Sequence, residues 1–313
     1  PRKCGSLAPC AAGASCSVPG SVTSRAIRSV WATSPSDIWA VGAAATVLHY
    51  DGTSWTATPA ANIPLTTATQ LNSVWASASS DVWAVGSAGK IIHYDGSKWA
   101  LSASGAQRDL RSISGVNGQS IWAVGLAASA TMPGEFWRWN GSTWTAITPV
   151  GNGNLYTVLA VNSSFVLGGG GSNASGILWA FDGVGKFTDY STSAIVEVYG
   201  LWAASPTRAV AVGAVGEILR FDGATWKLNN NNISNDLNSI SSDGSNTYIV
   251  GTGGFAVRSS DPALSALTPI TSVPLSTLWT AQLANNGLVW LAGDNSATLS
   301  GSQISVDRGV MKY

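Results

Sequence analysis

The sequence contains little charge and few of the side chains that most active sites need. Charged residues make up 10% of its 313 residues, and 16 basic side chains balance 16 acidic ones. Proteins that hold a phosphate backbone usually present a basic stripe, so the sequence argues against a nucleic-acid partner. There are three glutamates and two histidines, and no G-x-S-x-G, H-E-x-x-H or phosphate-loop motif occurs. These absences predict a protein that is not an enzyme and that uses no metal or cofactor.

Long hydrophobic runs are also missing. Apolar residues reach 45%, but no stretch approaches the roughly 18 apolar residues that a membrane-spanning helix requires. We therefore expect no transmembrane segment. The chain begins at Pro1, without a methionine or a signal peptide, which suggests a processed or trimmed chain.

Cysteine is scarce and confined to the first residues. Cys4, Cys10 and Cys16 are spaced C-x5-C-x5-C in a stretch of Gly, Ala, Ser and Pro without hydrophobic periodicity. This order resembles the front half of a small secreted knuckle of the EGF-like kind. We predict that residues 1–24 form a separate leader with one intrachain disulfide, the third thiol being unpaired or paired to another chain. Three free thiols are the alternative, and the spacing matches no common zinc pattern. A disulfide would place the protein outside the cytoplasm.

A repeat dominates the rest of the chain. The segment from Asp81 to Gly86, D-V-W-A-V-G, recurs at residues 37–42 and 120–125 and, more weakly, four more times. The glycines that close these segments are spaced 44, 39, 43, 45, 38 and 42 residues apart, and they are Gly42, Gly86, Gly125, Gly168, Gly213, Gly251 and Gly293. Such a period is the length of one four-stranded propeller blade. The sequence thus predicts an all-β fold, a seven-bladed β-propeller of four-stranded antiparallel blades over residues 25–313.

Each repeat can be divided into four strands. In the repeat from Leu71 to Trp99, an innermost strand begins at Leu71, and later strands cover residues 82–85, 90–94 and 98–101. An Asx-Gly pair turns the third strand into the fourth, since both turn positions favour positive φ. The pairs are Asp51-Gly52, Asp95-Gly96, Asn140-Gly141, Asp182-Gly183 and Asp222-Gly223. No helix follows the run of glycines at 168–171, so it cannot bind a nucleotide phosphate at a helix N-terminus, and it is interpreted as a flexible loop.

The last repeat lacks the Asx-Gly turn and begins at Leu275. Residues 297–299 and 303–306 can supply its outer strands. We therefore expect the chain to complete this repeat without a strand from the N-terminal end, with residues 21–25 as a lead-in.

Aromatic residues recur at fixed positions of the repeat. One column holds Trp39, Trp83, Trp122, Phe165, Val210, Tyr248 and Trp290, and another, after the Asx-Gly turn, holds Trp55, Trp99, Trp144 and Trp226. Large side chains fill the wedge that widens between blades, each contributing roughly 2–3 kcal/mol. We interpret both columns, and Trp31, Trp75, Trp202 and Trp279 on the innermost strands, as packing. His49 and His93 occupy equivalent third-strand positions on separate blades, where we expect them to face solvent and to share no metal.

The turn also supports a family resemblance. Tyr50-Asp51-Gly52-Thr53-Ser54-Trp55 resembles a shortened Asp-box, the turn of sialidase-like propeller blades in which the Asp binds its own backbone. The pattern W-A-V-G-x-x-G-x-I-x-x-x-D-G-x-x-W is similar to photosystem-assembly-type propellers. It is most similar to the secreted, "DVWAVG…HYDG…W" propellers of predatory soil bacteria of the myxobacterial type. The resemblance implies a propeller and a bacterial, secreted origin.

The candidate binding site is a polar ring at the start of the innermost strands. Length variation falls on the loops of the face opposite the Asx-Gly turns, and insertions collect on the binding face of repeat proteins. On that face the first residues of the innermost strands are polar and differ between repeats: Arg28, Asn72, Arg111, Tyr156, Tyr199, Asn238 and Ser276. Such a ring suits hydrogen bonding to a neutral, hydroxyl-rich ligand. A solvated rim without a ligand is the alternative.

Together these features predict a non-catalytic extracellular binding or scaffold module. It would recognise a glycan, in a lectin-like or adhesive role, or a protein partner at the cell surface through the long-loop face. Two alternatives remain open. One is a structural subunit of a surface assembly or filament. The other is a sialidase-like or lyase-like propeller enzyme, which would need a deep axial pocket with two carboxylates about 5–9 Å apart.

Overall fold

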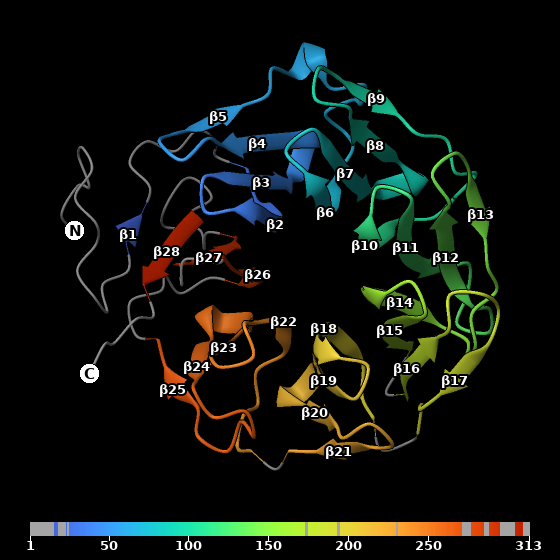
Figure 1. Cartoon of the computed structure of the whole chain (residues 1–313), viewed down its shortest axis with the longest axis vertical. Coiled ribbons are helices and arrows are strands. Elements are labelled where there is room, and N and C mark those ends of the chain that lie inside the picture. Colours follow the sequence, from blue (N-terminus) through green and yellow to red (C-terminus); the bar gives the residue numbers. More distant parts are fainter. Residues whose placement is uncertain are drawn as a thin grey trace.

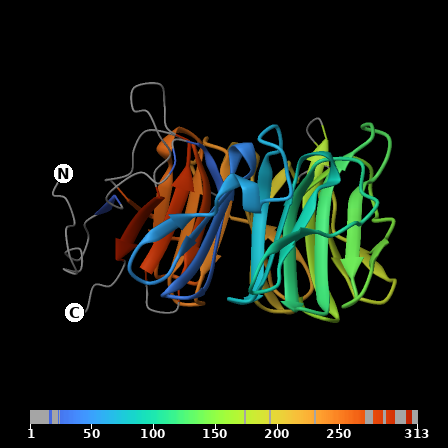
Figure 2. The ribbon, with the colours of Figure 1, turned by 90° about the horizontal axis from the view of Figure 1, so that it is seen from above.

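The structure is a computed structural model that describes residues 16–17, 23, 25–172, 175–192, 195–229, 231–270, 277–284, 288–294 and 304–308. Four-stranded antiparallel sheets are arranged radially around a central axis, with their first strands innermost (Figure 1). Seen from the side, the strands run roughly along that axis and form a squat ring (Figure 2). This arrangement confirms the predicted all-β propeller with four-stranded blades.

Six blades are each built from four strands that are consecutive in the sequence. Blade 1 contains β2 (Ile27–Ser34), β3 (Asp37–Gly42), β4 (Thr46–Tyr50) and β5 (Trp55–Ala57). Blade 2 contains β6 (Leu71–Ala78), β7 (Asp81–Gly86), β8 (Ile91–Tyr94) and β9 (Trp99–Leu101). Blade 3 contains β10 (Leu110–Asn117), β11 (Ser120–Ala127), β12 (Gly134–Trp139) and β13 (Trp144–Ala146).

The second half of the ring repeats this plan. Blade 4 contains β14 (Asn154–Asn162), β15 (Phe165–Ser172), β16 (Ser175–Phe181) and β17 (Phe187–Asp189). Blade 5 contains β18 (Val198–Ser205), β19 (Arg208–Gly213), β20 (Ile218–Phe221) and β21 (Trp226–Leu228). Blade 6 contains β22 (Leu237–Ser242), β23 (Thr247–Gly251), β24 (Ala256–Ser259) and β25 (Thr268–Pro269). Single 3-10 turns link second to third strands in four of the blades: η1 (Ala43–Ala45), η3 (Ser87–Gly89), η4 (Ala214–Gly216) and η5 (Thr252–Gly254).

The prediction of a seven-bladed propeller is wrong: the structure has six blades of four consecutive strands, and the remaining sheet is assembled from both ends of the chain. This closing sheet has the order β1-β28-β27-β26, made of Cys16–Ser17, Ile304–Arg308, Leu288–Gly293 and Leu278–Leu283. Cys16 pairs with Val306, and Ser17 with Ser305. The expectation that the last repeat closes without an N-terminal strand is therefore also wrong. The physical reason is that β28 presents an edge of backbone groups that can still pair, and Cys16 and Ser17 supply the partners for this edge.

Some predictions concern parts of the chain outside the described residues. These are Cys4, Cys10, the side chain of Cys16, residues 297–299 and Ser276. The predicted disulfide and the division at residues 24 and 25 therefore stay predictions. Within the described residues no helix is long and apolar enough to cross a membrane.

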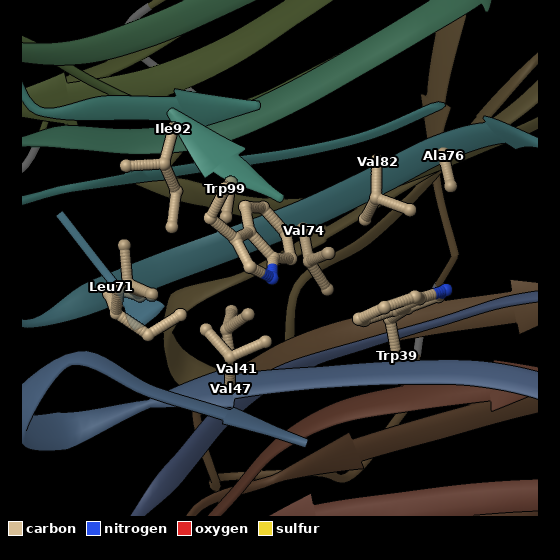
Figure 3. Packing of buried hydrophobic residues seen from close by; sticks show 11 residues of the cluster. Trp39, Val41, Val47, Leu71, Val74, Ala76, Val82, Ile92 and Trp99 are labelled. Atoms are coloured by element: carbon tan, nitrogen blue, oxygen red, sulfur yellow. The ribbon is translucent and has the colours of Figure 1, made fainter. Parts of the chain in front are cut away.

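The hydrophobic core is divided among the interfaces between neighbouring sheets. Between blades 1 and 2, Trp39, Val41 and Val47 pack against Leu71, Val74 and Trp99 (Figure 3). Corresponding clusters join blade 6 to the closing sheet and the closing sheet to blade 1. The tryptophans of the two columns meet across these interfaces: Trp99 lies 5.7 Å from Trp39, Trp144 lies 5.8 Å from Trp83, and Trp55 lies 5.5 Å from Trp290, all edge to face. The packing interpretation is confirmed for these pairs.

The repeat glycine is required by a close approach between strands. A Cβ on Gly42 would lie 2.0 Å from the Ala26 carbonyl oxygen, and one on Gly86 would lie 2.1 Å from that of Gln70. In blade 4 the corresponding residue is Gly170, which pairs with Leu155. A Cβ on Gly170 would lie 2.0 Å from the Asn154 carbonyl oxygen. The predicted register at Gly168 is thus wrong by two residues. The glycine run is also buried strand β15, not a flexible loop.

Candidate functional site

An axial pocket with a volume of about 530 Å³ opens among the innermost strands, and six of the seven predicted ring residues line it. They are Arg28, Asn72, Arg111, Tyr156, Tyr199 and Asn238. Each directly follows an apolar residue that pairs with the repeat glycine, as Leu71 pairs with Gly86. The same register therefore brings six residues from six blades to one pocket.

The pocket lies on the predicted face of the ring. The innermost strands that line the pocket begin at the residues that pair with the repeat glycines. The 3-10 turns η1 and η3 directly follow two of these glycines, so the pocket and these turns lie at the same end of the blades. The Asx-Gly turns lie at the other end of the blades, where Gly52 packs on Ser36 and Gly96 on Ser80, in the turns between first and second strands. The ring residues and the Asx-Gly turns are thus separated by the length of the blade.

The closing sheet contributes an aromatic residue that the sequence analysis assigned elsewhere. Leu278 pairs with Gly293, so Trp279, and not Ser276, occupies the ring position. The column of inner-strand tryptophans continues instead with Gln282, which pairs with Trp290 as Trp31 pairs with Trp39. Trp279 lines the pocket, and its indole nitrogen is buried without a hydrogen-bond partner among the described residues. The last repeat is degenerate in sequence, so its strand register could not be recognised from the repeat pattern.

The two arginines of the pocket have few protein partners. The Arg28 guanidinium carbon lies 4.0 Å from the centre of the Trp279 ring, a cation–π contact. Arg111 Nη2 lies 3.5 Å from Asp109 Oδ2, with the arginine side chain 35% exposed. Within the described part of the chain, the buried Nε atoms of both arginines lack a hydrogen-bond acceptor. Burial lowers the pKa of Arg28, Asp294 opposes this change, and the nearby charge of Arg111 adds to it.

The two tyrosines lie on neighbouring innermost strands, Tyr156 on β14 and Tyr199 on β18. Their rings meet edge to face, 5.4 Å apart. Asn154 Nδ2 donates to the Tyr156 hydroxyl at 3.0 Å, and the Tyr199 hydroxyl donates to Glu197 Oε2 at 2.6 Å. Burial raises the pKa of both tyrosines, and the hydrogen bond to Glu197 raises that of Tyr199 further. Tyr156 therefore keeps a hydroxyl proton that it can donate, whereas that of Tyr199 is already engaged.

The two asparagines connect blades. Asn72 Nδ2 donates to the Leu110 carbonyl oxygen at 2.7 Å, and Asn238 Nδ2 donates to that of Leu278 at 2.8 Å. In each case the acceptor lies on the innermost strand of the next sheet. These residues line the pocket as predicted, but their amides contribute to the scaffold. Sequence alone cannot distinguish this role, since the acceptor is a backbone atom about 40 residues away.

Among the described residues, one acidic side chain, Asp236, contributes to the lining of the axial pocket. Its Oδ1 accepts the Val215 amide at 3.0 Å. No group of three or more His, Cys, Asp or Glu residues in the described ranges is placed to hold a metal ion. A second cavity of about 580 Å³ lies beside β4 and the link that follows β5, and no predicted site residue lines it.

The histidines lie away from the pocket and are half-buried, not fully solvent-facing. His93 stacks on Trp83, with ring centres 3.9 Å apart, and its Nε2 lies 2.7 Å from Asp81 Oδ1. In blade 1 the ring centres of His49 and Trp39 are 4.1 Å apart, and His49 Nε2 lies 2.6 Å from Asp37 Oδ1. Each histidine belongs to a structural unit within its own blade.

Comparison with solved structures shows the fold. The chain matches the structure described as YCF48 bound to D1 peptide with a TM-score of 0.73 and 16% identity, over 94% of this chain and 96% of that chain. The structure of YCF48 from Cyanidioschyzon merolae matches with a TM-score of 0.69 and 12% identity, over 94% of this chain and 98% of that chain. The WD40 β-propeller domain of Doa1 matches with a TM-score of 0.73 and 16% identity, over 94% of this chain and 95% of that chain. No protein-family model and no curated protein sequence matches this chain. These structural likenesses establish that the chain is a β-propeller.

Proposed function

We propose that the protein is a non-catalytic binding module that holds a segment of a partner protein in the axial pocket. The observation that carries this proposal is the pocket itself, where side chains from all six blades converge. Arg28, Arg111 and Tyr156 keep donor capacity there. One solved propeller of the same fold is described as bound to a peptide, which supports a peptide segment as the occupant.

The pocket lining favours binding over catalysis. The sialidase-like or lyase-like alternative needs two carboxylates facing one another. In the described lining Asp236 is the one acidic residue, and its carboxylate already accepts a backbone hydrogen bond. Glu197 accepts the Tyr199 hydroxyl. A binding role uses the donors that remain and needs no such pair.

The proposed location is extracellular or at the cell surface. It is supported by the C-x5-C-x5-C spacing of Cys4, Cys10 and Cys16 and by the resemblance to secreted bacterial propellers. Mass measurement with and without alkylation tests it. One disulfide in the unreduced protein is expected, whereas three alkylated cysteines would remove this support.

A glycan is the second candidate ligand. Tyr156 can donate its hydroxyl proton, and the aromatic rings of Tyr156, Tyr199 and Trp279 all line the pocket. Hydroxyl donors beside aromatic rings suit a sugar. A subunit of a surface assembly has less support, because the exposed apolar side chains on the outer strands, Leu101 and Leu228, belong to separate blades.

The purified protein should be applied in parallel to a glycan array and to a peptide array. We expect selective binding to peptides, weakened in an Arg111→Gln/Tyr156→Phe variant. Both residues line the pocket and neither substitution removes much packing, so the melting temperature should change little. Lys98→Ala, an exposed change beside the Asp95 turn, is the control. Binding that is lost in the Lys98 variant and kept in the pocket variant would show that the wrong face was chosen.

A further inference from the structure

Two arginines give the axial pocket hydrogen-bond donors that the described residues do not fully use. An arginine carries five N–H donors and no acceptor. Arg28 contacts the Trp279 ring, and Arg111 has one ion-pair partner, Asp109, at 3.5 Å. In the described part of the structure the Nε atoms of both arginines are buried and lack acceptors. A buried donor without an acceptor costs free energy, so a ligand that supplies acceptors is favoured here.

The donors are concentrated on one side of the ring. Arg28 lies on β2 and Arg111 on β10, with β6 and Asn72 between them. Burial lowers the pKa of Arg28 most, the charge of Asp294 raises it, and the charge of Arg111 adds a smaller lowering, so the two arginine charges repel one another within one pocket. A carboxylate relieves both the repulsion and the unpaired donors, because its oxygens match the planar fork of a guanidinium. This proposed ligand differs from the neutral, hydroxyl-rich ligand that the sequence suggested.

The other side of the ring has the opposite polarity. Asp236 lines the pocket at the start of blade 6, and the Tyr199 hydroxyl is bound to Glu197. A second negative charge on the ligand would lie near these carboxylates and be repelled. The pocket therefore favours a ligand with one acidic group, turned toward Arg28 and Arg111, over a polyanion.

We propose that the axial pocket recognises a single carboxylate on a peptide segment of the partner, bound jointly by Arg28 and Arg111, with Asp236 fixing its orientation. This inference rests on the proposed function. The carboxylate belongs to an acidic side chain or to the C-terminus of the segment, which offer the same chemistry.

Four probes test the proposal by two-dimensional NMR of the 15N-labelled protein, following the indole N–H signal of Trp279. They are acetyl-Ala-Glu-Ala-amide, acetyl-Ala-Ala-Ala with a free C-terminal carboxylate, the neutral acetyl-Ala-Gln-Ala-amide, and sodium glucuronate. At least one of the two peptide carboxylates should shift the signal in a saturable manner, at least tenfold more tightly than the neutral peptide. The tighter of the two identifies the side chain or the chain end as the source, and either result supports the proposal.

Matched variants locate the effect. Arg111→Gln and Arg28→Gln should each weaken the peptide carboxylate at least tenfold, whereas Arg108→Gln, which removes an exposed charge outside the lining, should leave its affinity within twofold. If Arg28→Gln fails to fold because it loses the contact with Trp279, Arg111→Gln carries the test.

Other outcomes overturn specific steps. Equal affinity for the Glu and Gln peptides would refute carboxylate recognition while leaving a peptide in the pocket. Tighter binding of glucuronate than of either peptide would refute the peptide source. If Arg108→Gln lowers the affinity for the peptide carboxylate as much as Arg111→Gln does, the effect comes from the net charge of the protein and not from the pocket. The proposed function itself fails if the pocket variants bind every array ligand as the unmodified protein does.

Discussion

His93, Trp83 and Asp81 act as one unit within blade 2. Trp83 is 2% exposed, stacks on His93 and meets Trp144 of blade 3. Its indole nitrogen donates to Asp81 Oδ1 at 2.8 Å, and Ser77 donates to the other carboxylate oxygen. Burial raises the pKa of Asp81, but the hydrogen bonds from His93, Ser77 and Trp83 outweigh burial and lower it overall. The blade is thus fixed by polar contacts as well as by packing.

Replacing Trp83 by Ala should destabilise the protein strongly. The substitution leaves a cavity between blades 2 and 3 and frees Asp81 of one donor, so we expect the free energy of unfolding to fall by about 3–5 kcal/mol. Urea unfolding followed by circular dichroism measures it. Leu101→Ala, at a side chain that is 54% exposed, is the control and should change stability by less than about 1 kcal/mol. Equal effects of the two substitutions would contradict the inter-blade packing.

Glu217 gives a second prediction, concerning pH. Its side chain is 7% exposed, and its carboxylate accepts the Val196 amide at 3.2 Å. Burial raises its pKa from 4.5 to about 7, so the folded protein binds this proton more tightly than the unfolded chain. The contribution to the free energy of unfolding is therefore largest below about pH 4.5 and is lost as the pH rises toward 7, by at most about 3 kcal/mol.

The matched variant is Glu217→Gln, which keeps the shape and cannot ionise. Urea unfolding of both proteins at pH 5 and pH 8 isolates the carboxylate, since the other titrating groups are shared. The variant should gain stability relative to the unmodified protein at pH 8 and differ less at pH 5. The same difference at both pH values would show that Glu217 stays ionised in the folded protein.

At the level of strands, serine hydroxyls connect four of the innermost strands to the next one. The Ser29 hydroxyl oxygen accepts the Val74 amide, and that of Ser73 accepts the Ile113 amide, both at 3.2 Å. Ser112 and Ser239 repeat the contact toward Val158 and Ala281. Blade 5 carries Gly200 at this position, where a Cβ would lie 3.1 Å from Ser239 Cα. The same Cβ would lie 2.9 Å from Val212 Cγ2 of blade 5, so a serine here would require its neighbours in both blades to shift.

Removing one of these contacts should weaken the junction between blades. Ser73→Ala leaves the Ile113 amide without its acceptor in a half-buried position, so we expect a loss of about 1–2 kcal/mol. Hydrogen exchange of the Ile113 amide should accelerate at the same time. Ser234→Ala, at an exposed loop position, is the control for removing a hydroxyl. Unchanged exchange at Ile113 would argue that another group accepts this amide.

At the level of the whole molecule, closure depends on residues that lie almost 300 positions apart. β1 pairs with β28 through two residue pairs, whereas β28 pairs with β27 through five. The closing sheet packs on blade 1 through Trp290 and on blade 6 through Leu278 and Leu291. Its inner strands are therefore fixed by neighbours on both sides.

Two truncations should consequently differ. Removing residues 1–17 deletes β1 and a two-residue pairing, so the melting temperature should fall by only a few degrees. Removing residues 304–313 deletes β28 and exposes the edge of β27, so we expect a much larger fall and association of the protein in size-exclusion chromatography. Equal effects of both truncations, or a larger effect of the first, would contradict the strand order of the closing sheet.

The local pattern of each repeat determined much of the structure. Alternating apolar residues, the Asx-Gly turns and the repeat glycine are signals within about 20 residues, and they correctly indicated the four strands of blade 2. The Asp51 turn behaves as expected, with Oδ1 accepting the amides of Thr53 and Ser54 at 2.8 Å. The same register predicted six residues that line the pocket, because a repeated position around an axis brings its side chains to a common centre.

Tertiary structure decided what local signals leave open. The pairing of strands determined that Gly170 is the repeat glycine of blade 4 and that Trp279 occupies the ring position of the closing sheet. This register depends on the residues of the neighbouring strand, which a local sequence pattern does not specify. Strand pairing also gave the last sheet an outer strand from residues 16–17. The roles of the ring residues were decided by contacts across blades, where the Asn72 amide found a backbone carbonyl while Arg28 and Arg111 kept unpaired donors. Sequence determined which side chains face the axis, but their free hydrogen-bonding groups depend on neighbours some 40 residues away.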